Sequence, residues 1–330
     1  MKKILFLLVV LSAMSVNTLA DGLTATLQQG DNMQVFYGTD AFKQAYEAAE
    51  SDDAIIILSL GTFNSVLSIE KSMTIVGCGA FSYPNTIISG TMKIMADNVK
   101  IEGIYFSSSI SLGAISNCHI KRCYLNTTLN ASDTHINTFI DQSVVMSDYA
   151  VGTGVNYTIQ NSTIESFYTM NTEDNKANIT NCVIYKFIGF GSSGYVNSDV
   201  KQPYAIYISN ILGHSRTGSN DNYNYTCSIL SEYYYNYFAG KYGTFTPSFP
   251  DGCKHDGNES GREYSGGYPA SEFSSIAYGT GIDGTVKGTY GGSGFKKESS
   301  IPKITSKTIP AYADEQGKIN VTISATTGPN

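Results

Sequence analysis

The most regular feature of the chain is a short phrase of apolar and polar positions that recurs through its middle. In each copy an Ile is followed by any residue, an Asn or Gln, a small residue, any residue and then Ile or Val. Apolar positions flank a polar centre, so each phrase predicts two short strands joined by a bend. The copies begin at Ile115, Ile140, Ile159 and Ile179, a looser one begins at Ile208, and Gly replaces Asn in those beginning at Ile75 and Ile101.

The polar centre of the phrase predicts the bend itself, because Asn and Gly enter the left-handed backbone region more readily than other residues. The centres lie 25, 19, 20 and 29 residues apart, and we expect their side chains to form a structural ladder between coils. The expected ladder is Asn117, Gln142, Asn161, Asn181 and Asn210. The step from Gly103 to Asn117 is only 14 residues, so one of these two is out of register.

A coil of about 20 residues cannot bury its inner face alone, but stacked coils bury one another. The pattern therefore predicts an all-β fold, a right-handed parallel β-helix. A β-sandwich would need hairpins, yet the repeat region has no Asn-Gly or Asp-Gly pair. A leucine-rich repeat would need a Leu scaffold with helix-forming return segments, which these Thr- and Ser-rich stretches lack.

Both ends of the repeat region differ from its middle. Residues 40–50 (DAFKQAYEAAE) predict a capping helix with one apolar face and Thr39 or Asp40 as N-cap. Residues 293–330 predict a C-terminal extension that ends in the alternating strand Lys318–Ser324. This extension either lies along the coils, caps their C-terminal end or docks to a partner. The β-helix domain itself is expected to span residues 21–292.

The first 20 residues have the pattern of a signal peptide. Two lysines precede a short apolar run, and small residues lead to a cleavage position near Ala20. We therefore expect export to the periplasm, the cell surface or the medium. No later segment is long and apolar enough to predict a membrane-spanning helix.

The charge balance narrows the set of partners. Lys and Arg total 21 and Asp and Glu total 28, which gives a net charge of −7. Such a chain is not suited to nucleic acid, and it disfavours a polyanionic glycan unless calcium bridges the two. No Cys or His cluster has zinc-site spacing, so no metal site or cofactor is expected, with calcium left as the open case.

Two stretches of the sequence resemble a known superfamily. The run from Ala41 through Ile55–Phe63 to Leu67–Gly77 resembles the opening of the pectin-lyase-like, parallel β-helix proteins. Ser275–Gly292 resembles the closing coil of secreted β-helix proteins of Gram-negative gut bacteria. The resemblance covers about residues 35 to 292 and implies the fold. It does not imply one activity, because this fold hosts many.

Catalytic residues are hard to find in the sequence. Pectate lyases of the superfamily need clustered acids and a basic residue, and polygalacturonase-like members need acid pairs with Gly-His-Gly and Arg-x-Lys, none of which is complete here. Asp133, Asp141 and Asp148 are the remaining candidates if they project from successive outward positions. Solvated turn acids are the simpler interpretation, so the sequence favours a protein without catalysis.

The tyrosines between residues 195 and 242 are the better binding candidates. A tyrosine ring stacks on a sugar while its hydroxyl forms hydrogen bonds, although tyrosines also fill β-helix cores. The candidate ligand-binding residues are Tyr223, Tyr225, Tyr233, Tyr235 and Tyr242. A loop insertion is expected at about 240–273, after most of these tyrosines. Cys227 and Cys253, which flank a long loop, are the candidate disulfide.

These observations lead to one expectation and two alternatives. We expect a secreted or cell-surface protein that binds polysaccharide without catalysis. The alternatives are a polysaccharide lyase or glycoside hydrolase, and a structural or adhesive surface protein. The sequence does not predict the oligomeric state.

Overall fold

The structure is a computed structural model, and it describes residues 22–50, 52–81, 83–131, 134–151, 154–169, 175–186, 204–214, 223–227, 229–240, 245–262, 280–296, 303–308 and 322–326. The expected signal peptide and two of the candidate site residues, Asp133 and Tyr242, lie outside these ranges.

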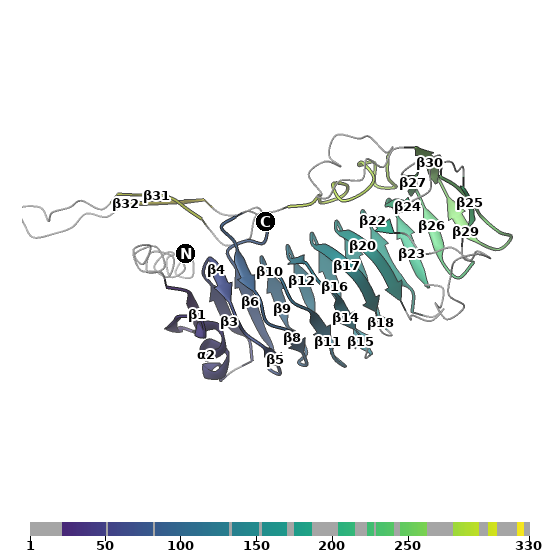
Figure 1. The fold of residues 1–330 in the computed structure, drawn as a ribbon. Coiled ribbons are helices and arrows are strands. Elements are labelled where there is room, and N and C mark those ends of the chain that lie inside the picture. Colours follow the sequence, from purple (N-terminus) through teal and green to yellow (C-terminus); the bar gives the residue numbers. More distant parts are fainter. Residues whose placement is uncertain are drawn as a thin grey trace, which may run out of the picture.

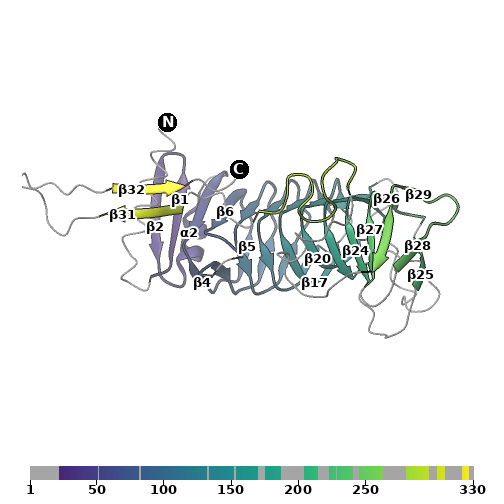
Figure 2. The ribbon, with the colours of Figure 1, turned by 90° about the horizontal axis from the view of Figure 1, so that it is seen from above.

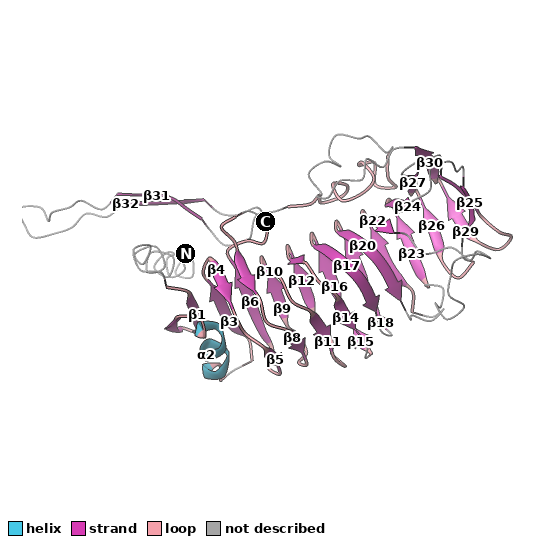
Figure 3. Cartoon of the chain, viewed as in Figure 1, coloured by secondary structure: helices cyan, strands magenta, loops and turns pink. Residues whose placement is uncertain are grey.

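The described strands stack one coil upon another along a single long axis (Figures 1 and 3). Sheet A has twelve strands, and all its pairs from β3 onward are parallel. The predicted all-β parallel β-helix is confirmed. In spatial order, sheet A is β2 (Asn32–Tyr37), β1 (Thr24–Gln29), β3 (Ala54–Leu58), β6 (Met73–Gly77), β9 (Lys100–Glu102), β12 (His119–Lys121), β16 (Phe139–Asp141), β19 (Thr158–Gln160), β21 (Ala177–Thr180), β23 (Ala205–Ile208), β26 (Glu232–Tyr234) and β29 (Lys254–Asp256).

Sheet B follows sheet A around each coil and carries a side branch that forms a third face. Its main path is β4 (Gly61–Phe63), β7 (Thr86–Ile88), β10 (Tyr105–Phe106), β13 (Tyr124–Leu125), β17 (Val144–Val151), β20 (Thr163–Thr169), β22 (Val183–Lys186), β24 (Ile211–His214), β27 (Tyr237–Gly240) and β30 (Glu259–Arg262). The branch is β5 (Leu67–Ile69), β8 (Met92–Ile94), β11 (Ile110–Leu112) and β14 (Leu129–Ala131), which joins β17. Separate pairs are β15 (His135–Ile136) with β18 (Gly154–Val155), and β25 (Tyr223–Thr226) with β28 (Phe245–Ser248).

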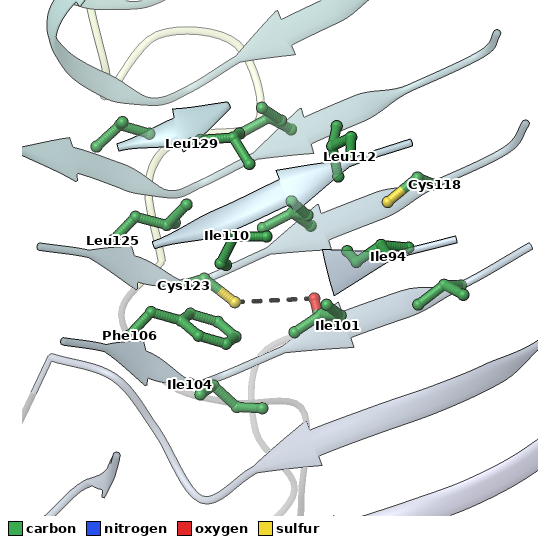
Figure 4. Packing of buried hydrophobic residues seen from close by; sticks show 14 of the residues in the cluster. Ile94, Ile101, Ile104, Phe106, Ile110, Leu112, Cys118, Cys123, Leu125 and Leu129 are labelled. Carbon is green, nitrogen blue, oxygen red and sulfur yellow. Dashed lines mark hydrogen bonds between the residues drawn. The ribbon is translucent and has the colours of Figure 1, made fainter. Parts of the chain in front are cut away.

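The core is built from equivalent positions that lie directly over one another. The central inward position of sheet A is a row of isoleucines that changes to tyrosine near the C-terminal end. Its members are Ile56, Ile75, Ile101, Ile120, Ile140, Ile159, Ile179, Tyr207 and Tyr233. Figure 4 shows how side chains from the three faces of successive coils meet in the interior. This interlocking of coils explains why no coil needs a complete core of its own.

Each typical coil has two left-handed bends, whereas the sequence pattern predicted one. The first precedes the sheet A strand, and its residues are Asn98, Asn117, Asn137 and Asn156. The second joins sheet A to sheet B, and its residues are Gly103, Arg122, Gln142, Asn161, Asn181, Ser209, Tyr235 and Gly257. The expected single ladder is therefore wrong in register. Asn117 belongs to the first bend, and Asn210 lies one residue after the second.

Two separate polar ladders replace the predicted one. At the first bend, an amide ladder runs from Asn156 to Asn137, Asn117 and Asn98, with Nδ2 donating to Oδ1 at 2.9 to 3.0 Å. Just after the second bend, buried Asn210 donates to Asn236 and Asn236 donates to Asn258. Their Oδ1 atoms also accept backbone N–H groups from the coil before. The two ladders therefore provide hydrogen-bond partners for the Asn side chains at or next to the bends. The second ladder also provides partners for nearby backbone N–H groups.

An N-terminal cap closes the first coil. β1 pairs antiparallel with β2 on one side and with β3 on the other. The predicted helix is present as α2 (Ala41–Ala48), which buries Phe42 and Ala45 against the core and has Asp40 at its N-cap. The Lys71 ammonium donates to two carbonyls at the end of this helix. The cap thus covers the first inward row, as a solenoid requires.

Residues 280–296 form a strap rather than the closing coil suggested by the sequence resemblance. They add no strand to sheet A or sheet B and lie over the outside of several coils (Figure 2). Gly288 N–H donates to Ser209, Asn161 Nδ2 donates to the Thr289 carbonyl, and Phe295 packs on Phe81 at 5.2 Å. The strap therefore runs from a late coil back toward the N-terminal end.

The strap buries an outward row that would otherwise expose apolar side chains. Val144, Thr163, Val183 and Ile211 occupy equivalent outward positions of sheet B, and each is at most 3% exposed. They lie two residues after the second bend. Val183, Ile211, Tyr237 and Tyr290 belong to an apolar cluster separate from the main core. The solenoid thus has a second, external core beneath the strap.

Two predictions for the C-terminal third need revision. The expected loop insertion at 240–273 contains β28, β29 and β30, so part of it is a further coil. The C-terminal extension forms the antiparallel hairpin β31 (Lys303–Thr308) with β32 (Thr322–Thr326), which includes part of the expected strand. In Figures 1 and 2 this hairpin lies at the N-terminal end of the coils and projects past it.

Gly291→Ala should loosen the strap, because an added Cβ would meet the Val286 carbonyl and the Asn181 side chain. We expect a cost of up to about 3 kcal/mol from overpacking, measured by urea unfolding, with faster proteolysis of the strap. Gly284→Ala is the control, since its Cβ would enter open space and cost only the positive φ of 78°, about 1 kcal/mol. Equal effects of the two substitutions would show that close contact does not hold the strap.

Candidate functional site

Two of the three candidate acids lie in strands of different sheets, and the third, Asp133, lies outside the described residues. Asp141 ends β16 in sheet A, whereas Asp148 lies in β17 of sheet B, in register with Ser166. The expectation that they project from successive positions on one face is therefore wrong for these two residues. Among the described residues, no group of three or more His, Cys, Asp or Glu side chains could hold a metal ion.

Asp141 is held by neighbours on both sides. Its carboxylate accepts from Gln160 Nε2 at 3.3 Å and lies 3.9 Å from Lys121 Nζ. Burial raises its pKa, while the Gln160 hydrogen bond and the Lys121 charge oppose that shift. The side chain is 5% exposed, so a substrate has little access to it. This arrangement suits a structural acid better than a general acid.

Arg122 is the most unusual residue on this side of the molecule. It occupies a second-bend position with φ of 51°, and it is 1% exposed. Its guanidinium donates to Gln142 Oε1 at 2.9 Å and to Glu102 Oε1 at 3.1 Å, one coil away on either side. Arg122 therefore makes a charged version of the contacts that Asn makes elsewhere between coils. The buried charge is paired, as buried charges must be.

A second charged group lies near the C-terminal end of sheet A. Glu232 accepts from Lys176 at 2.8 Å and from Lys254 at 3.3 Å, and the Tyr234 hydroxyl donates to its other oxygen. Burial alone would raise the pKa of Glu232, but the hydrogen bonds from Lys176, Tyr234 and Lys254 together hold it below its usual value. The carboxylate is thus ionised and fully engaged, which leaves it no role as a proton acceptor.

Of the candidate tyrosines, the structure assigns a clear role only to Tyr233. Its ring is fully buried and stacks on Tyr207 at 5.4 Å, so it is a core residue and its assignment to ligand binding is wrong. Tyr235 is partly exposed at a second-bend position with φ of 55°. Tyr223 and Tyr225 belong to β25, but their side chains lie outside the described structure.

The candidate disulfide remains a prediction. Cys227 and Cys253 are both thiols in the structure, and both pack against the main core. Cys227 N–H donates to Ser248 and Cys253 N–H donates to Pro250, so both attach to one short turn. Burial raises the pKa of the Cys227 thiol, and the neighbouring Cys253 adds to that shift.

An aromatic patch that the sequence analysis missed lies on sheet B near the N-terminal end. Tyr105 and Tyr124 stack at 4.9 Å, Phe81 meets Tyr124 edge-on at 6.0 Å, and Phe295 meets Phe81 at 5.2 Å. We define the aromatic patch as Phe81, Tyr83, Tyr105, Tyr124 and Phe295. Tyr105 and Tyr124 each lie two residues after a second-bend residue, in the outward row that the strap covers farther along. Recognising Arg122 as a bend residue would have revealed this pair.

Tyr83 is the exposed member of the patch, with 94% of its surface accessible. It lies in the loop between β6 and β7, which is fixed at both ends. Cys78 N–H donates to Thr86 Oγ1, Gly79 N–H donates to the Gly103 carbonyl, and Gly61 N–H donates to the Asn85 carbonyl. A loop fixed at both ends thus exposes the Tyr83 ring two residues from Phe81, whose own ring meets the partly exposed Tyr124. Exposed aromatic rings on such loops are found in binding sites.

The hydroxyl groups of this patch are suited to hydrogen bonding. Burial raises the pKa of Tyr124, and the neighbouring Tyr105 adds to that shift. The Tyr124 hydroxyl therefore stays protonated at neutral pH and can act as both donor and acceptor. Together with the ring surfaces, these groups match a ligand that has apolar faces and a hydroxylated rim.

Comparisons with known proteins give no match. No family model matches the sequence, and no match is found among curated proteins or solved structures. A search of the described residues also finds no helix long and apolar enough to cross a membrane.

Replacing Arg122 with Leu should remove the guanidinium that pairs with the Glu102 carboxylate, a group only 19% exposed. We expect a loss of about 3 kcal/mol in urea unfolding, because a largely buried ion pair is broken. Lys43→Ala is the control, because Lys43 and its partner Glu47 are both more than half exposed. Breaking this exposed ion pair should cost at most about 0.5 kcal/mol. A double change, Arg122→Leu with Glu102→Leu, should recover part of the loss. No recovery would mean that the ion pair is not the cause.

His135 should make the fold sensitive to acid. It is fully buried against Tyr157, and burial lowers its pKa from 6.5 to about 4. Between pH 6.5 and 4 the unfolded chain therefore binds a proton at this residue that the folded chain does not bind. The free energy of unfolding has its full value above pH 6.5 and falls as the pH drops toward 4. His135→Gln should remove roughly 3 kcal/mol of this loss, measured by urea unfolding across that range.

His119 is a second acid-sensitive residue, because burial and the Lys121 charge lower its pKa to about 4 as well. The single variant should therefore keep the part of the acid response that comes from His119. His255→Gln is the control, because this residue is exposed on the last described strand of sheet A. An unchanged acid response in His135→Gln would contradict the assignment.

Proposed function

We propose that the chain is an exported, non-catalytic β-helix protein of the pectin-lyase-like superfamily that binds neutral polysaccharide through the aromatic patch. The observation that carries the proposal is the stacked, partly exposed pair Tyr105 and Tyr124, which Phe81 joins to the loop that exposes the Tyr83 ring. Aromatic rings pack on the apolar faces of sugars, and tyrosine hydroxyls bind their hydroxyl groups.

The choice of a neutral glycan rests on charge. The net charge of −7 repels a polyanion at long range. No member of the patch is charged, so the patch offers an acidic sugar no counter-charge. A polymer is favoured over a small molecule because the coils form an extended, rigid surface with equivalent positions repeated about 4.8 Å apart.

The proposal that the protein is non-catalytic is supported by acids that are already engaged by other side chains. Asp141 is nearly inaccessible, Glu102 is bound by Arg122, and Glu232 is bound by two lysines and a tyrosine. Glycoside hydrolysis needs two accessible carboxyl groups on opposite sides of a sugar bond. These carboxyl groups instead connect neighbouring coils.

Calorimetry with purified neutral and acidic glycans from plants, hosts and bacteria tests the proposal. We expect binding to a neutral polysaccharide, with about a tenfold loss of affinity in Tyr83→Ala, which corresponds to about 1.4 kcal/mol. Tyr37→Ala is the matched control, because Tyr37 is 60% exposed but lies in β2, outside the patch. No binding across the panel, or equal losses in both variants, would refute the proposed site.

The same glycans separate binding from catalysis. After long incubation we expect no new reducing ends and no absorbance from unsaturated sugars. If such products appear and Asp141→Asn abolishes them, the protein is a hydrolase or a lyase. Binding without products, and unaffected by Asp141→Asn, supports the non-catalytic function.

A further inference from the structure

We propose that two copies of this chain associate end to end, each placing its β31–β32 hairpin along the free edge of β2 in the other. The proposal concerns self-association, and it is independent of the glycan-binding function. It joins an acceptor edge and a donor hairpin that lie at the same end of the molecule.

The acceptor is β2, the outermost strand of sheet A. Within the described structure it pairs only with β1, through six consecutive residue pairs without a bulge. Every second residue of an antiparallel strand turns its N–H and C=O away from its partner, so β2 presents unused backbone groups on its outer side. These groups are available to a further strand.

Sheet edges are usually protected by charge, proline, bulges or short length. β2 has none of these protections: its sequence is NMQVFY, and it is six residues long. Val35 is 37% exposed and Tyr37 is 60% exposed. An uncharged, regular and partly apolar edge of this kind is a template for strand addition.

The donor is the C-terminal hairpin. β31 and β32 form a two-stranded sheet of their own and pair with no other described strand. Two strands alone are at best marginally stable in water, and a third strand gives such a unit a larger sheet to join. Pairing with an edge strand would thus stabilise the hairpin and protect the edge in one step.

The strap explains why donor and acceptor lie at the same end. The chain leaves the last described coil near the C-terminal end, yet the strap returns it to Phe81, where Phe295 packs. Phe81 follows β6, which is separated from β2 only by β3 and β1 in sheet A. Figures 1 and 2 show the hairpin at this end of the molecule, where it projects past the first strands.

The location of both elements fixes the symmetry of the assembly. When donor and acceptor lie at one end, a second copy rotated by 180° can give its hairpin and receive one in return. Such a reciprocal interface closes as a dimer, whereas a donor and acceptor at opposite ends would produce a filament. The structure therefore points to a closed, head-to-head dimer.

Light scattering after size-exclusion chromatography of the full chain, over a range of concentrations, tests the proposal. We expect a mass twice that of the monomer, and a shift to monomer in Val35→Lys, which places a charge on the β2 edge. Val66→Lys is the matched control, because Val66 is 77% exposed but lies outside the strands. Ile323→Pro in β32 should also give a monomer, because proline cannot donate to the ladder.

Hydrogen exchange separates the proposal from its rivals. In the dimer, β2 should be protected, and both Val35→Lys and Ile323→Pro should remove that protection. A monomer whose β2 is protected, and loses protection in Ile323→Pro, would show that the hairpin pairs with its own chain. A filament, a monomer with an unprotected edge, or a dimer unchanged by both substitutions would each overturn the head-to-head dimer.

Discussion

Hydrogen bonding between successive coils at the second bend is the constraint on which this architecture depends. The N–H of each left-handed residue donates to the coil that follows, as in Arg122 to Asp141, Gln142 to Gln160 and Asn161 to Thr180. This hydrogen bond fixes the register of the coils. It thereby aligns equivalent residues of successive coils in sheet A, in sheet B and in the core. Any side chain therefore packs mainly against its own equivalents, and a long row of one residue type can form a core.

The same constraint explains why the sequence predicted the fold but not the register. Backbone N–H groups make the inter-coil bond, so the bend tolerates Gly, Arg, Gln, Asn, Ser and Tyr. A pattern based on Asn therefore joins Asn117, at one bend, to Asn161 at the other. The isoleucines were easier to interpret, because burial demands an apolar side chain at every coil and leaves a strict pattern.

The strap and the site could not be found by periodicity, because both depend on contacts far apart in the sequence. Asn161 binds the strap 130 residues away, and the glycines that permit this approach also fit a closing coil. The prediction that the candidate acids share one face was wrong for a related reason. Two bends in each coil change the outward direction twice, so spacing alone does not tell which sheet Asp141 or Asp148 occupies. Tyr233 was assigned wrongly because a run of tyrosines in the sequence does not show which rings face the core and which face the solvent.

The strap also gives the outward row of sheet B two different roles. Where the strap covers the row, the outward residues include Val183 and Ile211, which belong to a buried apolar cluster. Nearer the N-terminal end, past Phe295, the same position holds Tyr105 and Tyr124, whose rings remain partly exposed. Aliphatic residues need cover, whereas tyrosine tolerates contact with water through its hydroxyl. Beneath the strap this row is therefore a docking surface, and at Tyr105 and Tyr124 the same row carries rings that remain partly exposed.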